Sequence, residues 1–217
     1  RNFARGKFKF RSTASGAAPT EEDLFKVVTG GLRGTGMPTF ADLPEPQRWA
    51  VVRYVTELAG VGDDPVDPVV IPAAPGNLAS ASRIAAGKIE WRKSGCDTCH
   101  GDTGRGDGPS APSVTKQQRR DLVIPDFAVQ PFKGGDDPAD LYRTIVTGLD
   151  GTAMPAFSAD ADVLWDLVAY VRTLRAEVVE PGYRRAAEAF IRTQYAQAKH
   201  AAAGGCGCKA GKLKTEF

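Results

Sequence analysis

The chain has 217 residues, of which 42% are hydrophobic and 25% charged, and its net charge is +2. This length allows one or two compact domains, and the nearly balanced charge gives no indication of nucleic-acid binding. The sequence has no run of about 18 or more apolar residues, so we expect no membrane-spanning helix in it.

The first 61 residues predict two helices joined by a glycine-rich loop. The acidic residues after Thr20 are typical of a first helical turn, and this helix is expected to run to Val28 and stop at Gly30. Pro46 predicts the start of a second helix that continues to about Ala59. The expected buried face of the second helix consists of Trp49, Val52, Val55 and Leu58.

Residues 62–78 are acidic and rich in proline, a composition typical of an extended, semi-rigid spacer. The chain then predicts another helix that leads into a group of thiols and an imidazole. Its apolar stripe is expected to consist of Leu78, Ala81, Ala85 and Ile89.

The strongest chemical signal is Cys96-Asp97-Thr98-Cys99-His100, the attachment pattern of c-type haem. Each thiol can add to one vinyl group of the macrocycle, and His100 is then held under the iron as the proximal ligand. Thioredoxin-like redox chemistry or half of a zinc site would also use two such thiols. Zinc would need two further ligands, however, and the other cysteines and histidine lie about a hundred residues away.

Residues 116–126 are polar and basic, and we expect them to form a surface loop over a haem propionate. Phe127 and Phe132 are candidates for packing against the haem, although ordinary core packing explains them equally well. Asp136-Asp137-Pro138 predicts the start of a short helix that ends at about Val146.

Met154 is the candidate for the second axial ligand. It lies before Pro155 at the end of a glycine-rich loop, a setting that suits a thioether held at a fixed angle. The alternative is a methionine that fills a gap in the core. A closing helix is expected from about Asp160 to Glu177. Its expected buried face consists of Val163, Leu164, Leu167, Val168, Val171 and Leu174.

The last segment, residues 179–217, predicts a helix from Arg184 to Ala203 and a basic tail. His200 is expected to be exposed on this helix rather than to bind iron. Cys206 and Cys208 lack the spacing and the histidine for haem, and an i,i+2 disulfide would be strained, so this pair has no assigned role.

Residues 79 to 176 resemble a class I cytochrome c domain. The resemblance rests on the Cys96–His100 motif, the glycine-rich run after it, the Met154-Pro155 loop, and Gly87, Trp91, Trp165 and Tyr170 in the flanking helices. It implies an all-α fold around one covalent haem, with Gly87 allowing close approach of the closing helix. The predicted divisions are a first lobe (1–61), a linker (62–78), the haem domain (79–178) and an extension (179–217).

The first lobe repeats the second half of the haem domain without its cysteines. At an offset of 117, the segment from Asp23 to Phe40 matches the segment from Asp140 to Phe157, and Met37-Pro38 matches Met154-Pro155. Residues 12–16 look like an insertion in the first copy. The histidine that would accompany Met37 falls upstream of Arg1. We therefore expect a second haem under Met37 if an upstream or partner segment supplies an attachment motif; a haem-free relic lobe is the alternative.

Together these patterns predict a periplasmic or otherwise extracytoplasmic cytochrome that transfers single electrons in a respiratory chain. It would act as a carrier or as the electron-transfer subunit of a membrane or periplasmic oxidoreductase complex. Such cytochromes mature outside the cytoplasm, so a signal or anchor is expected to have been removed or to lie upstream. A di-haem peroxidase-like enzyme and a structural subunit of a respiratory assembly are the alternatives.

Overall fold

The computed structural model describes residues 2–62, 66–117 and 124–175. Within these ranges the regular structure is helical, and β-structure is limited to two isolated bridges, Thr13 with Pro68 and Leu32 with Met37. The all-α prediction is therefore confirmed. The expected C-terminal helix, His200, Cys206 and Cys208 lie outside the described residues.

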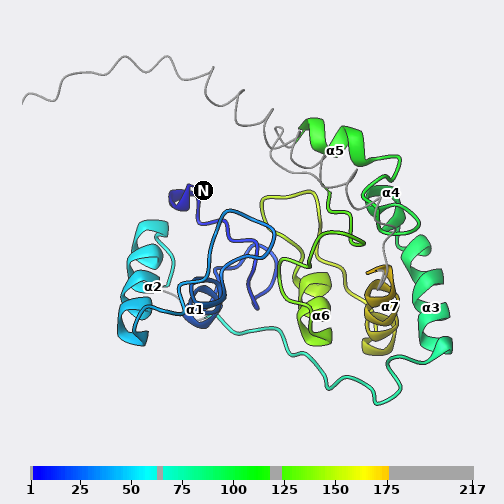
Figure 1. Cartoon of the computed structure of the whole chain (residues 1–217), viewed down its shortest axis with the longest axis horizontal. Helices are drawn as coiled ribbons and strands as arrows, with labels where there is room; N and C mark the ends of the chain where they lie inside the picture. The colour runs from blue at the N-terminus through cyan, green and yellow to red at the C-terminus, as the bar shows by residue number, and fades with distance from the viewer. Residues whose placement is uncertain (1, 63–65, 118–123, 176–217) are drawn as a thin grey trace, which may run out of the picture.

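The helices form two groups, which we call the first and second lobes (Figure 1). The first lobe contains the 3-10 helix η1 (Phe3–Arg5), α1 (Glu21–Gly30) and α2 (Glu45–Ala59). The second contains α3 (Ala81–Lys93), α4 (Asp97–His100), α5 (Ala111–Gln117), α6 (Pro138–Thr147) and α7 (Ala161–Leu174). Each lobe has its own apolar core, centred on Val52 in the first and on Val168 in the second.

The helix boundaries follow local capping signals. Thr20 and Asp23 form a reciprocal capping box at the start of α1, as the acidic run after Thr20 suggested. Helix α2 follows Pro44 and ends at Gly60, which adopts a left-handed conformation. The expected face of α2 is wrong in one position, because Leu58 is 46% exposed.

Helices α3 and α7 pack closely because Gly87 has no side chain. A Cβ atom at this position would lie 1.9 Å from the Asp166 carbonyl oxygen, so only glycine permits this approach. The predicted stripe of α3 is wrong beyond Leu78, because Ala81, Ala85 and Ile89 are exposed. Its buried face instead runs through Ile84, Gly87 and Trp91.

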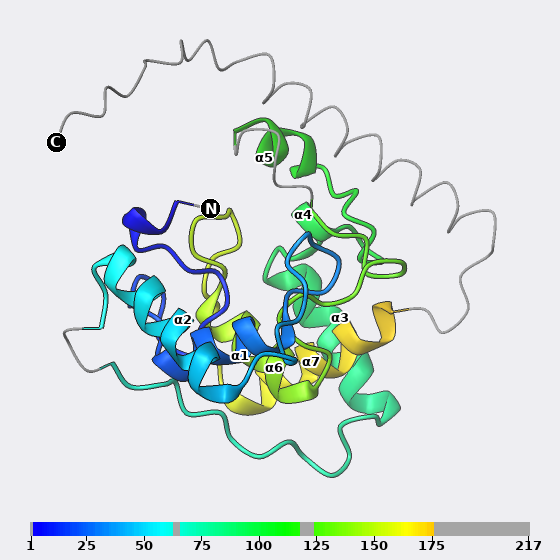
Figure 2. The same ribbon diagram turned by 60° about the vertical axis from the view of Figure 1, so that its left-hand side comes forward.

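The linker lies along one side of the molecule and passes beneath both lobes (Figures 1 and 2). Val69 donates its N–H to the Ser12 carbonyl (2.8 Å), and Pro68 pairs with Thr13. Ile71 packs against the second core, of which Leu78 is a buried member. The described part of the linker is therefore attached to both lobes along its length.

Three short helices among the described residues were not expected from the sequence: η1, α4 and α5. Helix α5 begins at Ala111, and its end covers the first residues of the predicted 116–126 loop. Of the helices in the described ranges, none is both long and apolar enough to span a membrane.

Candidate functional site

The single turn α4 brings Cys96, Cys99 and His100 together. Cys96 occupies the N-cap, and its carbonyl accepts a hydrogen bond from the His100 N–H (2.9 Å). Residues three and four apart on a helix share one face, so both sulfurs and the imidazole are presented in the same direction. The two thiols are free, and burial, with a smaller contribution from Asp97, raises the pKa of Cys96 to about 11.

His100 lies between two aromatic rings. Its ring centroid is 5.0 Å from that of Phe127, in a stacked arrangement, and 5.6 Å from that of Trp91. Burial lowers the pKa of His100 to about 4, so the imidazole is neutral at pH 7. Its Nδ1 atom is buried and has no hydrogen-bond partner among the described residues.

The backbone after His100 is held by the two helices that cross at Gly87. The Trp91 indole N–H donates to the Gly101 carbonyl (3.1 Å), and the Tyr170 hydroxyl donates to the Asp102 carbonyl (2.8 Å). The two rings also contact each other edge to face, with centroids 5.8 Å apart. The sequence pointed to Trp91 and Tyr170 only through the family resemblance and gave no sign of these two hydrogen bonds.

Met154 lies on the loop between α6 and α7. The Leu149 N–H donates to the Met154 carbonyl (3.1 Å), and the Thr152 hydroxyl both donates to the Leu149 carbonyl (2.7 Å) and accepts from the Met154 N–H (3.1 Å). Gly148 is left-handed, and a Cβ atom there would lie 2.5 Å from the Ala156 nitrogen. These hydrogen bonds close the loop between Leu149 and Met154. Pro155, the next residue, is exposed.

The Met37 loop has the same hydrogen bonds. The Leu32 N–H donates to the Met37 carbonyl (3.1 Å), and Thr35 repeats both bonds of Thr152 at 2.7 and 3.1 Å. Gly31 is left-handed like Gly148. Both loops lie on the same side of the molecule as α4 and α5 (Figure 2). The internal repeat predicted from the sequence is thus a repeat of backbone structure.

The repeat also extends to the supporting side chains. Phe25 stacks on Trp49 with centroids 4.2 Å apart, and the equivalent Tyr142 and Trp165 lie 4.6 Å apart.

Helices α2 and α7 differ in how far their equivalent residues are buried. Leu167, Tyr170 and Leu174 of α7 are buried, whereas their α2 equivalents, Val51, Tyr54 and Leu58, are exposed.

These residues fit a covalently attached haem. The donor set consists of two free thiols at the right spacing and a neutral imidazole with an unpartnered buried nitrogen. Apolar aromatic rings surround the imidazole. The unpaired Nδ1 atom of His100 costs about 1–3 kcal/mol, which marks the imidazole as a group that the described protein atoms alone do not satisfy. No group of three or more His, Cys, Asp or Glu residues that could hold a metal ion occurs in the described ranges.

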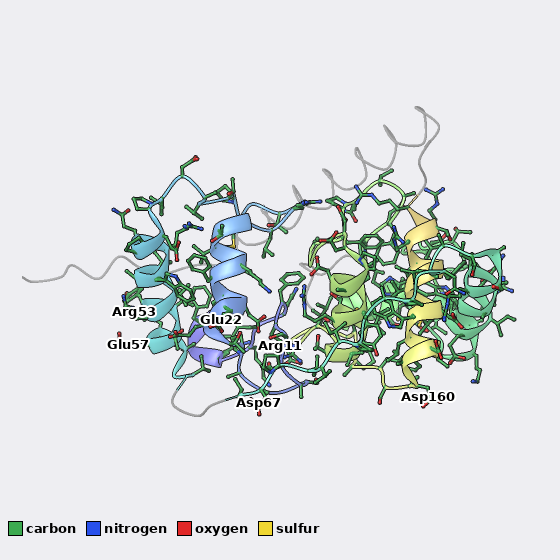
Figure 3. The ribbon with its side chains drawn as sticks, turned by 90° about the horizontal axis from the view of Figure 1, so that it is seen from below. Arg11, Glu22, Arg53, Glu57, Asp67 and Asp160 are labelled. Carbon is green, nitrogen blue, oxygen red and sulfur yellow. The ribbon has the colours of Figure 1, made fainter. Side chains whose placement is uncertain are left out.

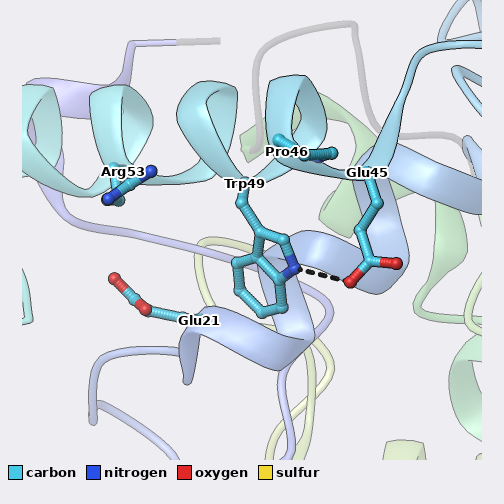
Figure 4. A pocket seen from close by; sticks show the side chains of 5 residues that line it. All are labelled: Glu21, Glu45, Pro46, Trp49 and Arg53. Atoms are coloured by element: carbon cyan, nitrogen blue, oxygen red, sulfur yellow. Dashed lines mark hydrogen bonds between the residues drawn. The ribbon is translucent and has the colours of Figure 1, made fainter.

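One hollow on the described surface lies elsewhere. It has a volume of about 530 Å³ and is lined by Glu21, Glu45, Pro46, Trp49 and Arg53 (Figure 4). Its lining offers no thiol, imidazole or thioether, so it does not take part in the site.

Comparisons with known proteins agree with this geometry. The family model of cytochrome c oxidase, cbb3-type, subunit III matches residues 82–171, which span the Cys96–His100 motif and Met154. Among solved structures, the chain is similar to a chain of the Kuenenia stuttgartiensis reducing HAO-like protein complex Kustc0457/Kustc0458. The two share 35% sequence identity and a TM-score of 0.73, with 81% of each chain covered. None of the curated proteins matches this chain.

Proposed function

This chain belongs to the class I c-type cytochromes, and we propose that it is the electron-transfer subunit of a larger periplasmic oxidoreductase. Electron transfer through haem is the activity of its family. The observation that carries the proposal is the turn α4, which presents Cys96, Cys99 and a neutral His100 on one face. A freely diffusing carrier is the alternative within the same family.

Each residue of the proposed site has a distinct role. Cys96 and Cys99 would hold the haem through thioether bonds, and His100 and Met154 would be its axial ligands. The haem supplies the one-electron chemistry of iron, and a His/Met pair raises its reduction potential. The rings of Trp91 and Phe127 exclude water from the imidazole, and Pro155 stiffens the Met154 loop. With His100 and Met154 both holding the haem, the site would suit electron transfer better than oxygen or peroxide chemistry.

We further propose that Met37 is an axial ligand of a second haem. The support is the matching hydrogen-bond pattern of the Met37 and Met154 loops. A second observation is the exposed apolar face of α2, whose counterpart on α7 is buried. The sequence of 217 residues contains one Cys-x-x-Cys-His motif, so the attachment motif for the second haem would come from polypeptide outside it.

The proposed partner and compartment rest on the comparisons. A relative with 35% identity belongs to a multi-protein complex, which supports a role as a subunit. Covalent haem attachment in this family takes place outside the cytoplasm, which supports an extracytoplasmic location.

Substitution of the two methionines tests the proposed ligation. In the oxidised holoprotein, Met154→Ala is expected to abolish the sulfur-to-iron charge-transfer band and lower the reduction potential, because the thioether raises it. Met37→Ala, the matched control, is expected to leave the band of the Cys96/Cys99 haem unchanged. The mass of the denatured chain should show one covalent haem in both variants.

Three outcomes would contradict the proposal. A colourless protein would exclude the haem, and a band that survives Met154→Ala would exclude Met154 as the ligand. Peroxide turnover by the wild-type protein would favour the peroxidase-like alternative. For Met37, a protein that also carries the attachment half of the first lobe should hold two covalent haems by mass, and one haem would exclude the second site.

A further inference from the structure

Arg11 of the first lobe is buried against the second lobe (Figure 3). Its guanidinium donates to the Thr147 carbonyl (2.8 Å) and to Asp150 Oδ1 (2.9 Å). Thr147 is the last residue of α6, so Arg11 satisfies one of the carbonyls that a helix end leaves unpaired. The cation also lies at the negative end of the helix dipole, where it is favoured.

Asp150 lies in the Met154 loop, four residues before the methionine. Besides Arg11, its carboxylate accepts hydrogen bonds from the Ser15 hydroxyl (3.1 Å) and the Gly16 N–H (3.0 Å). We call the segment Arg11–Gly16 the strap. It contains residues 12–16, which the comparison of the two lobes identified as an insertion. The inserted residues therefore contact the methionine loop of the other lobe.

The strap is itself held in place. The Ser12 N–H and hydroxyl both donate to Asp23 Oδ2, at 2.7 and 2.9 Å, and the Thr13 hydroxyl donates to the Ala18 carbonyl (2.6 Å). Asp23 is buried and belongs to the α1 capping box. A segment fixed in this way can resist movement of the loop that it contacts.

The other methionine loop has a weaker version of this contact. Arg33 stands at the position equivalent to Asp150 and forms an ion pair with Asp136 of the second lobe. Its side chain is 64% exposed, whereas that of Arg11 is fully buried. Exposed ion pairs contribute little, about 0–1 kcal/mol. A buried charge that loses its partner costs far more, so Arg11 and Asp150 form the stronger link.

From these contacts we propose that Arg11 and Asp150 are positioning residues for Met154. This inference rests on the proposed role of Met154 as an axial ligand. Movement of the Met154 loop away from the site would require the hydrogen bonds at Asp150 to break, so the strap opposes that movement at the base of the loop. The first lobe thereby sets how readily Met154 is displaced in the second.

The test is displacement of Met154 by imidazole in the oxidised holoprotein, followed through the sulfur-to-iron band. For Asp150→Asn we expect the half-saturating imidazole concentration to fall about tenfold, because a charge-assisted hydrogen-bond set is lost. Arg11→Gln should act in the same direction. Arg11→Lys, which keeps the charge but loses most of the donors, should give an intermediate value. Arg33→Gln removes the exposed pair and is the matched control, with no expected change.

Replacement variants and a second measurement keep the test decisive. If Arg11→Gln does not fold, Asp150→Asn and Ser15→Ala, which alter less-buried groups, take its place. In the same variants, amide hydrogen exchange at Thr152 and Met154 should become faster than in the wild type, a readout independent of imidazole.

The outcomes separate the two proposals. If imidazole affinity and amide exchange in Asp150→Asn equal those of the wild type, the positioning role is excluded and the ligand role of Met154 stands. If the wild-type protein lacks the sulfur-to-iron band, the ligand role itself fails. Equal effects of Arg33→Gln and Asp150→Asn would also overturn the proposal, because they would indicate general loss of lobe contacts.

Discussion

At the scale of single residues, Trp91 connects the core of the second lobe to the turn that carries Cys96, Cys99 and His100. Its ring contacts His100 and Tyr170, and its indole N–H reaches the carbonyl of Gly101, the residue directly after the histidine. Trp91 is 4% exposed, so water cannot replace the hydrogen bond if the indole is removed.

Trp91→Phe is therefore expected to lower the free energy of unfolding by about 1–3 kcal/mol, the cost of an unsatisfied buried acceptor. Trp49→Phe is the matched control, since the Trp49 N–H donates at 3.3 Å to the exposed Glu45 and water can substitute (Figure 4). Its expected loss is within about 0.5 kcal/mol. Urea unfolding of the holoprotein measures the loss of stability in both variants. Equal losses would show that the Trp91 hydrogen bond contributes no more to stability than the Trp49 hydrogen bond.

At the scale of helices, the crossing of α3 and α7 supports the whole site. Helix α3 carries Trp91, α7 carries Tyr170, and α4 follows α3 directly. Because the helices meet at Gly87 without an intervening side chain, the positions of both aromatic residues depend on that contact.

Gly87→Ala should destabilise the protein although alanine is the better helix former. The added Cβ would lie 1.9 Å from the Asp166 carbonyl oxygen, and the resulting overpacking is expected to cost about 1–3 kcal/mol or more. At Gly30, also helical, a Cβ meets no atom within 4 Å. Gly30→Ala should therefore leave Tm unchanged or raise it. A Gly87→Ala variant with unchanged Tm would contradict the close crossing.

Helix positions were largely predictable from the sequence, but which face of α3 is buried was not. Capping residues, prolines and glycines act locally, so the limits of α1, α2 and α6 followed from neighbouring residues. The buried face depends on the partner helix. Because α7 approaches at Gly87, Gly87 and Trp91 are the buried residues of α3, and Ile89 is left at 69% exposure.

The grouping of two thiols and an imidazole on one turn was predictable for the same local reason, since the three residues lie within five positions and need no tertiary information. Arg11 shows the opposite case. Arg11 and Asp150 lie 139 positions apart, and nothing in the sequence distinguishes Arg11 from the other basic residues near it. Their contact could therefore not be predicted from the sequence.

At the scale of the whole molecule, the two lobes share loops and helices but differ in burial. Leu58 of α2 is 46% exposed, whereas the equivalent Leu174 of α7 is 9% exposed. Equivalent residues of the repeat therefore contribute different amounts to the free energy of unfolding.

Leu174→Ala is expected to cost about 2–5 kcal/mol in the free energy of unfolding, because it leaves a cavity in the core of the second lobe. Leu58→Ala in the same chain should cost less than about 1 kcal/mol, because much of its surface already faces solvent. Thermal and urea unfolding of the two variants measure the difference. A large loss for Leu58→Ala would mean that the α2 face is covered in the protein in solution.

The linker has a consequence for how the molecule meets other proteins. It is bonded to the strap through Ser12 and Thr13, the strap holds Asp150, and α3 continues from the linker's far end. Among the described residues, these contacts close a ring that passes through both lobes. Because the strap and the linker join the two lobes at separate points, a protein that docks on one methionine loop should find the position of the other restricted by these contacts.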